Sequence, residues 1–155
     1  MRDEPTMTLR PATSADAAAI TECVCAAYLP WIGTVGRQPG PMLADYAKVI
    51  ATHEVHVAER EGSVVGVLVI DATDGRVFVD NVCVDPAVQG QGLGRLLLAF
   101  AEGQARRRGL KSIELSTHEL MLSNLALYAT LGYVVTERRV VDGYPRVFMS
   151  KALAS

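Results

Sequence analysis

Glycines alternate with other residues in a short segment near the middle of the chain, which reads Gln89, Gly90, Gln91, Gly92, Leu93, Gly94 and Arg95. Before it, residues 77–84 are rich in β-branched side chains and predict a strand. After it, residues 95–102 repeat apolar side chains at helical spacing. Glycines let a ligand approach the backbone closely, and the free amides at the start of a helix favour an anion. The segment predicts an anion-binding turn, with a purely structural tight turn as the alternative.

Two familiar nucleotide-binding patterns do not fit this segment. A Walker loop needs Gly-Lys followed by Ser or Thr, whereas Gly94 is followed by Arg95 and Leu96. A dinucleotide fingerprint needs a third glycine three positions after the second, and Arg95 or Leu97 stands there, depending on where the count begins. The pattern that remains is Gln-x-x-Gly-x-Gly on a turn from strand to helix.

Five other polar side chains could move protons or hold a ligand. Asn124 and Tyr128 are four residues apart on a predicted helix and therefore share one face. Asp80 and Asn81 are adjacent in an otherwise apolar strand, so alternation predicts that they point to opposite faces and that one meets a pocket. Asp80 could accept a proton, and His118 is a weaker candidate whose ordinary pKa suits proton transfer near neutrality. A hydrogen-bonded structural role is the alternative for Asp80 and for Asn81.

The glycine pattern resembles the acetyl-coenzyme A signature of the GNAT acetyltransferase superfamily, in which this turn wraps the pyrophosphate of the cofactor. Two more segments are similar to family landmarks in the same order, residues 9–16 at the opening strand and residues 124–133 around Asn124 and Tyr128. The resemblance implies an α/β (α+β) fold with a twisted, mixed and mainly antiparallel sheet flanked by helices. Its central strands, residues 76–84 and 111–116, would splay apart, and the pantetheine arm would add to the open edge as an extra strand.

The resemblance also implies a function. Acetyl-CoA would be the co-substrate, and its acetyl group would pass to a primary amine of a small molecule or peptide by direct attack in a ternary complex. Tyr128 would protonate the departing thiolate. Phe78 stands where histone-acetylating relatives carry a glutamate base, so Asp80 and Asn81 are left as the other catalytic candidates. The implied cofactor-binding residues are Val82, Cys83, Val84, Gln89, Gly90, Gln91, Gly92, Leu93, Gly94, Arg95, Asn124 and Tyr128.

The acceptor amine is expected beside the first helices, because in relatives these helices and their connection wall that side of the site. Tyr28, Trp31, Asp80 and His118 are the predicted acceptor-binding residues, and a carboxyl-terminal hairpin around Tyr144 and Arg146 adds a further wall. No residue among them specifies one amine. A non-catalytic acyl-CoA-binding sensor or partner-binding module is the second interpretation, because no obvious general base is present.

Length and composition bound the remaining expectations. The 155 residues, half of them hydrophobic, predict one domain spanning residues 1–155, which the resemblance implies is a GNAT acetyltransferase domain. A net charge of −2 gives no attraction for nucleic acid, and the longest apolar run, residues 64–70, is short of the roughly 20 residues that span a membrane. The acidic amino end, residues 1–5, precedes no apolar signal core, so a cytoplasmic protein is expected. A homodimer is compatible with all of this.

Neither disulfides nor metal ligands are predicted. Cys23 and Cys25 are two apart on a predicted helix and point to different sides, while Cys83 belongs to the central strand. His53 and His56 have no Cys, Asp or Glu cluster at metal-site spacing.

Local signals place the elements that must position these side chains. Residues 31–41, rich in Gly and Pro, are expected to lack regular structure. Ser14 or Asp16 and Ser123 are expected to cap helices, and Gly109 to end one in a left-handed conformation. The predicted helices are 16–28, 42–51, 95–108 and 124–131, and the predicted strands are 7–10, 55–59, 63–71, 76–84 and 111–116, followed by a hairpin around residues 142–143.

Overall fold

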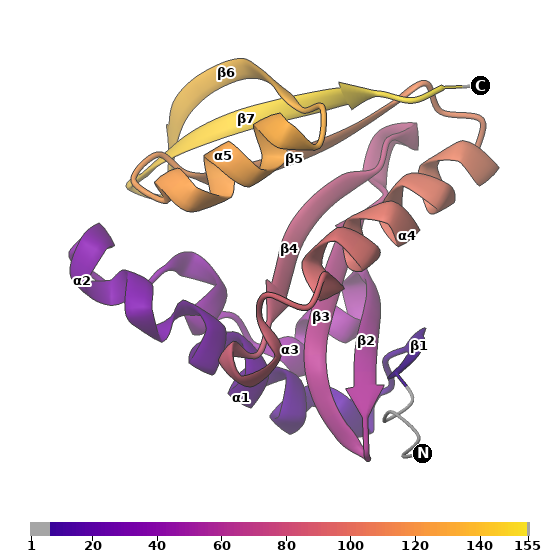
Figure 1. The fold of residues 1–155 in the computed structure, drawn as a ribbon, viewed down its shortest axis with the longest axis vertical. Coiled ribbons are helices and arrows are strands. Elements are labelled where there is room, and N and C mark those ends of the chain that lie inside the picture. The colour runs from indigo at the N-terminus through magenta and orange to yellow at the C-terminus, as the bar shows by residue number, and fades with distance from the viewer. Residues whose placement is uncertain (1–6, 155) are drawn as a thin grey trace.

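Residues 7–154 are described by a computed structural model, and the acidic amino end lies outside them. One seven-stranded sheet runs through the molecule in the order β1-β2-β3-β4-β5-β7-β6 (Figure 1). Its strands are β1 (Met7–Pro11), β2 (Glu54–Arg60), β3 (Ser63–Asp71), β4 (Phe78–Val84), β5 (Ser112–His118), β6 (Val134–Val141) and β7 (Tyr144–Ala152). The helices are α1 (Ala17–Tyr28), α2 (Ile32–Val35), α3 (Tyr46–Thr52), α4 (Leu93–Arg107) and α5 (Leu122–Thr130).

The sheet divides between β4 and β5. All neighbouring strands pair antiparallel except these two, which are parallel and pair only at Phe78 with Glu114 and at Val79 with Leu115. Beyond Val79 the two strands separate, as Figure 1 shows for the lower part of β4. The predicted mixed, mainly antiparallel sheet with splayed central strands is confirmed, and the edge of β4 that faces β5 has no strand partner along residues 80–84.

A β-bulge in β4 corrects the expected directions of two polar side chains. Val79 pairs with Ile70 and Asn81 pairs with Val69, so Asp80 is an extra residue with no partner on β3. A bulge interrupts the alternation of side chains. The prediction that Asp80 and Asn81 point to opposite faces is therefore wrong, because it assumed a regular strand.

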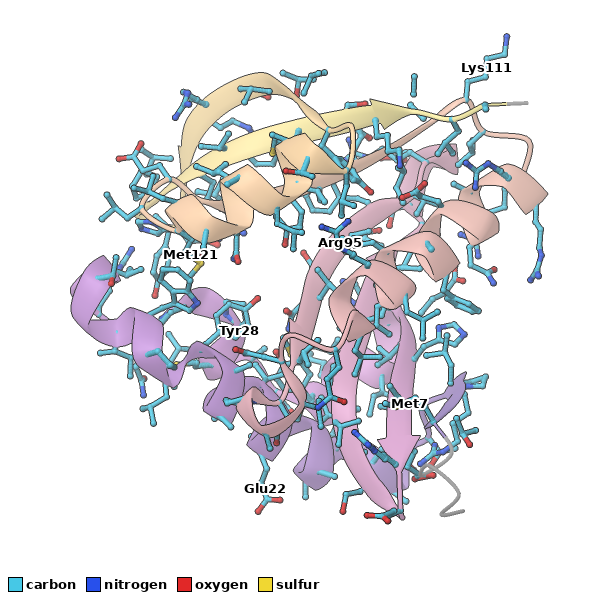
Figure 2. All side chains as sticks on the ribbon, in the orientation of Figure 1. Met7, Glu22, Tyr28, Arg95, Lys111 and Met121 are labelled. Carbon is cyan, nitrogen blue, oxygen red and sulfur yellow. The ribbon has the colours of Figure 1, made fainter. Side chains whose placement is uncertain are left out.

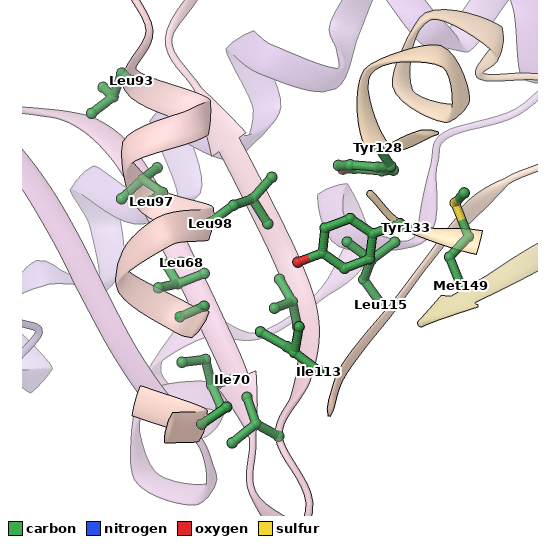
Figure 3. Close-up of a cluster of buried hydrophobic side chains, with 14 of the residues drawn as sticks. Leu68, Ile70, Leu93, Leu97, Leu98, Ile113, Leu115, Tyr128, Tyr133 and Met149 are labelled. Atoms are coloured by element: carbon green, nitrogen blue, oxygen red, sulfur yellow. The ribbon is translucent and has the colours of Figure 1, made fainter. Parts of the chain in front are cut away.

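The hydrophobic core lies on both faces of the sheet. On one face α4 inserts Leu97, Leu98 and Ala101 against β3, β4 and β5, and Tyr128 and Tyr133 from the α5 region complete this cluster (Figure 3). On the other face α1 and α3 cover β2, β3 and β4. A Cβ at Gly66 would lie 3.1 Å from Leu93 Cδ2, so this glycine lets the start of α4 sit directly on the sheet.

The segment between α1 and β2 is more regular than its composition predicted. Residues 31–41 include α2 and parts of short 3-10 turns at Leu29–Trp31 and Gly40–Leu43, so the expectation of no regular structure is wrong. The following helix begins at Tyr46 and not at residue 42, because the Asp45 carboxylate accepts hydrogen bonds from the first free amides, including Ala47 N–H at 3.1 Å.

The predicted end of α4 is correct, whereas the predicted cap of α5 is not. Gly109 has the expected left-handed φ of 72° directly after α4. Residues 14–16 form a short 3-10 turn before α1, and the Asp16 carboxylate accepts from Thr13 N–H at 2.7 Å. Ser123 does not cap α5, because the helix already begins at Leu122.

One helical stretch among the described residues, Ser14–Val35, is long and apolar enough to cross a membrane by length and composition alone. Asp16 and Glu22 interrupt it, so no uninterrupted apolar run marks it in the sequence. In the fold, its residues Ile20 and Val24 are fully buried in the cluster between α1, α3 and the sheet.

Candidate active site

The glycine turn exposes the amides at the start of α4. Gly90 and Gly92 have φ angles of 81° and 83°, in the left-handed region that glycine adopts without strain. Gly94 lies inside the first turn of the helix. Leu96 N–H donates to Gly92 O at 3.0 Å, so the three preceding amides lie ahead of this first helical bond and remain free for a ligand.

Two glutamines fix this turn and point in different directions. Gln89 Nε2 donates to Val84 O at 3.1 Å and ties the turn to the end of β4. Gln91 Oε1 accepts from Arg60 Nη1 at 3.0 Å, and Gln91 does not line the neighbouring cavity. Of the predicted cofactor contacts, Gln91 is therefore the one whose side chain the fold turns away.

A cavity of about 310 Å³, here called the cleft, opens between α1, β4, the glycine turn and α5. In Figure 2, Tyr28 at the end of α1 and Arg95 at the start of α4 mark two walls of this cleft. Apart from Gln91, the predicted cofactor-binding residues all line the cleft. They are Val82, Cys83, Val84, Gln89, Gly90, Gly92, Leu93, Gly94, Arg95, Asn124 and Tyr128.

Two more cavities continue from the cleft through the gap between β4 and β5. A constriction of about 20 Å³, the neck, shares Tyr28, Val82, Asn124 and Tyr128 with the cleft. A cavity of about 410 Å³, the groove, shares a different set of side chains with the neck. This set includes Asp80, Asn81, Ser116, Tyr144 and Arg146. The cleft and the groove therefore both adjoin the neck.

Tyr128 stands where the cleft meets the neck. Its side chain is 7% exposed, and burial raises the pKa of its hydroxyl to about 12. Asn124 lies one helical turn earlier, and its Nδ2 donates to Thr117 Oγ1 at 3.4 Å. Both side chains line the cleft and the neck, so the shared face that their spacing predicted is directed toward the cavities.

Asn81 holds two tyrosines in place. Tyr28 donates its hydroxyl hydrogen to Asn81 Oδ1 at 2.8 Å, and Asn81 Nδ2 donates to the hydroxyl oxygen of Tyr46 at 3.2 Å. Tyr46 in turn donates to Pro41 O at 2.7 Å. A side-chain amide whose oxygen and nitrogen both make hydrogen bonds cannot serve as a base. The hydrogen-bonded structural role, which was the alternative for Asn81, therefore fits this residue. Burial raises the pKa of Tyr28 well above its ordinary value, and this side chain faces both the cleft and the neck.

Asp80 is the carboxylate nearest the neck. It lines the neck and the groove, and its side chain is 52% exposed. Burial of part of the carboxyl raises its pKa, while His53, whose Nε2 lies 3.9 Å away, acts in the opposite direction. A carboxylate with a raised pKa is a better proton acceptor near neutrality than an ordinary aspartate.

The other predicted acceptor residues divide between the cavities. His118 lines the neck, but its Nδ1 accepts from Leu120 N–H at 3.1 Å, and burial lowers its pKa, with Arg146 acting in the same direction. Trp31 lines the cleft together with Tyr28 but neither of the other cavities, which separates it from Asp80 and His118. Among the described residues, no group of three or more His, Cys, Asp and Glu side chains could hold a metal ion.

Two groove residues were not singled out from the sequence. Ser116 on β5 accepts from Arg146 Nε at 3.0 Å, and Tyr46 on α3 lines the groove behind Asn81. Ser116 could have been found by continuing the alternation of β5. Tyr46 could not, because its predicted helix carried no signal of what it packs against.

The family model described as Acetyltransferase (GNAT) family matches residues 24–133, which is more than half of the chain. The chain belongs to this family. The match contains the glycine turn and α5, and it ends before β6 and β7, which form the far wall of the groove.

Individual relatives agree with the family. L-methionine sulfoximine/L-methionine sulfone acetyltransferase of Salmonella typhimurium strain LT2 is 33% identical over 139 residues, covering 84% of this chain and 81% of that protein. IAA acetyltransferase of Azospirillum brasilense is 37% identical over 79 residues, covering 50% of this chain. That match covers 52% of the relative, so the chain spans about half of its length. The crystal structure of a GNAT family acetyltransferase from Elizabethkingia anophelis with acetyl-CoA bound has a TM-score of 0.73 at 18% identity, covering 95% and 98% of the two chains.

Proposed function

We propose that this protein transfers the acetyl group of acetyl-CoA to a primary amine while both are bound. The observation that carries the proposal is the meeting of the cleft and the groove at Tyr128 and Asp80. A thioester lying in the cleft and an amine entering from the groove can react at the neck without a covalent enzyme intermediate. The Elizabethkingia structure, which holds acetyl-CoA on the same fold, supports this choice of donor.

The chain offers a binding surface for each part of the donor. The free amides of residues 93–95 and the Arg95 side chain would bind the pyrophosphate at the positive end of α4. The unpaired edge of β4 along Val82, Cys83 and Val84 would bind the amides of the pantetheine arm as a neighbouring strand would. Asn124 would contact the same arm from α5.

The reaction at the neck needs an acceptor for one proton and a donor for the departing sulfur. The amine nitrogen attacks the thioester carbon, the C–S bond breaks, and one proton must leave the nitrogen. Asp80 accepts that proton, directly or through water, and its raised pKa favours this role. The sulfur leaves with the electron pair of the broken bond and needs a donor.

Tyr128 supplies that donor as a hydrogen bond. Its pKa of about 12 keeps the hydroxyl protonated at any ordinary pH. A hydroxyl that holds its proton this firmly is a weaker acid than an ordinary thiol, so full transfer of its proton to the thiolate would be unfavourable. We therefore assign Tyr128 the stabilisation of the departing thiolate, which afterwards takes its proton from solvent.

Free-thiol release from acetyl-CoA in the presence of a panel of amines tests the proposal. We expect at least one class of primary amine to raise thiol release well above hydrolysis and to yield an N-acetyl product by mass spectrometry. Tight binding of acetyl-CoA with no amine-dependent thiol release would instead favour a non-catalytic acyl-CoA sensor. The proposal keeps the expected cytoplasmic location and does not depend on a homodimer.

A further inference from the structure

Two of the three arginines that line the groove are paired with carboxylates. Arg76 lies 3.4 Å from Glu114, and Arg139 lies 3.3 Å from Glu137. Arg146, the third arginine of the groove, has no carboxylate within 4.0 Å among residues 7–154. It is half-buried at the junction of the groove and the neck, where an unpaired cation is costly.

Ser116 fixes the orientation of this guanidinium. Arg146 Nε donates to Ser116 Oγ at 3.0 Å, and Arg146 Nη2 donates to Ser116 O at 3.2 Å. These bonds use one edge of the group and two of its five hydrogens. The Nη1 and Nη2 edge keeps two parallel donors, which match the two oxygens of a carboxylate.

The position of Arg146 separates it from the donor site. Arg146 lines the neck and the groove but not the cleft, so the pyrophosphate and pantetheine surfaces lie elsewhere. Asp80, of opposite charge, lines the same two cavities from β4, while Arg146 belongs to β7 on the other side of the gap. One small constriction therefore presents an anion and a cation from opposite walls.

Building on the proposed function, we propose that the acceptor carries a carboxylate beside its amine, as a free α-amino acid does, and that Arg146 binds this carboxylate. The amine then faces Asp80 and the thioester at the neck. The neck, about 20 Å³ in volume, has room only for the narrow end of such a molecule, which carries the amine. The side chain of the amino acid extends into the groove between Tyr46 and Phe148. An amine that lacks the carboxylate leaves the guanidinium unpaired.

Matched acceptors test this assignment on the wild-type protein. L-amino acids are compared with their α-amides and their decarboxylated amines by free-thiol release. We expect kcat/KM to be about 10- to 100-fold higher for the amino acids, which corresponds to one lost charge-assisted interaction. Equal or better use of amides and simple amines would overturn the inference while the proposed function stands. Absence of amine-dependent release with every acceptor would overturn both.

Variants of Arg146 provide the second arm. Arg146→Gln should lower kcat/KM for amino acids by the same factor, mainly through KM, should lower it much less for the amides, and should leave the affinity for CoA unchanged. Arg138→Gln removes an equal charge from β6 at a side chain outside both cavities, and it should change neither acceptor class. An equal loss for amino acids and amides in folded Arg146→Gln, checked by thermal unfolding, would overturn the carboxylate-binding role. The wild-type comparison decides the question if this variant does not fold.

Discussion

Replacing Gly94 by alanine separates cofactor binding from folding more sharply than any other change in the glycine turn. Gly92 is unsuited to this purpose, because its φ of 83° would strain any side chain. Gly94 lies within α4, in helical backbone. A Cβ there meets only Val84 Cγ2, at 3.9 Å, which is ordinary van der Waals contact. The fold can therefore accept the methyl group.

The stability of the Gly94→Ala variant should rise slightly. Replacing glycine by alanine in compatible helical backbone stabilises by about 0.4–1 kcal/mol, mainly because the unfolded chain loses conformational freedom. In a chain of this size, that gain raises Tm by about 1–4 °C. Nothing within the fold opposes the change.

The affinity for coenzyme A should fall in the same variant. The new methyl group lies in the wall of the cleft beside Val84, where the ligand must approach the free amides of α4. Loss of one charge-assisted hydrogen bond to a phosphate oxygen costs about 1.5–3 kcal/mol, or roughly a 10- to 150-fold higher Kd. Stability and affinity should thus move in opposite directions.

Thermal unfolding and calorimetric titration with coenzyme A measure the two effects. Gly103→Ala is the matched control, because Gly103 lies in the same helix, outside the cleft, and its Cβ would meet no atom within 4 Å. The control should gain a similar stability and keep the wild-type Kd. Wild-type affinity in Gly94→Ala would refute the close approach of the cofactor to this backbone. Equal losses of stability and affinity would support a merely structural turn.

Three further changes probe the neck, the core and the first turn. Tyr128→Phe should lower kcat by about 10- to 100-fold with an unchanged Kd for coenzyme A. The loss should be constant from pH 6 to 9, because the tyrosine stays protonated over that range. A loss confined to one part of the range would contradict the hydrogen-bond role. Gly66→Ala should destabilise by about 1–3 kcal/mol in denaturant unfolding, because its Cβ would press on Leu93 at 3.1 Å; a neutral result would mean that α4 can shift freely. Asp16→Asn should cost about 1–3 kcal/mol at pH 7, because hydrogen bonds from Arg10 hold the pKa of Asp16 well below its usual range. That contribution is present above the unfolded pKa of about 3.9 and is lost as pH falls through the lower folded value, so the difference from wild type should shrink below about pH 4.

The strands and the splay of the sheet follow from local signals and from the family resemblance. Alternation and turn residues suffice to locate β2 and β3, because a short turn joins them, although a register shift beside Ala58 interrupts their pairing. The bulge at Asp80 could not be predicted, since nothing in the order of residues around it marks an extra residue in the pairing. The directions of Asp80 and Asn81 depended on that one register shift.

The donor and acceptor sides differ in how far sequence can predict them. The proposed donor side consists largely of backbone groups, such as the amides of residues 93–95, and glycine would permit the close approach of the cofactor that they require. The acceptor side consists of side chains, including Asp80 on β4 and Arg146 on β7, that are 66 positions apart and meet only because β5 and β7 fill the other half of the sheet.

Binding by backbone groups also tolerates substitutions that binding by side chains does not. The edge of β4 can bind an extended amide chain whatever side chains it carries, so substitutions along Val82 to Val84 should leave the choice of donor intact. Binding in the groove depends on individual side chains, since one substitution at Arg146 removes its unpaired cation. The family match extends over the donor side and stops at residue 133, before the strand that carries Arg146. A chain of this fold can therefore keep acetyl-CoA as its donor while the last hairpin adapts the site to a different amine.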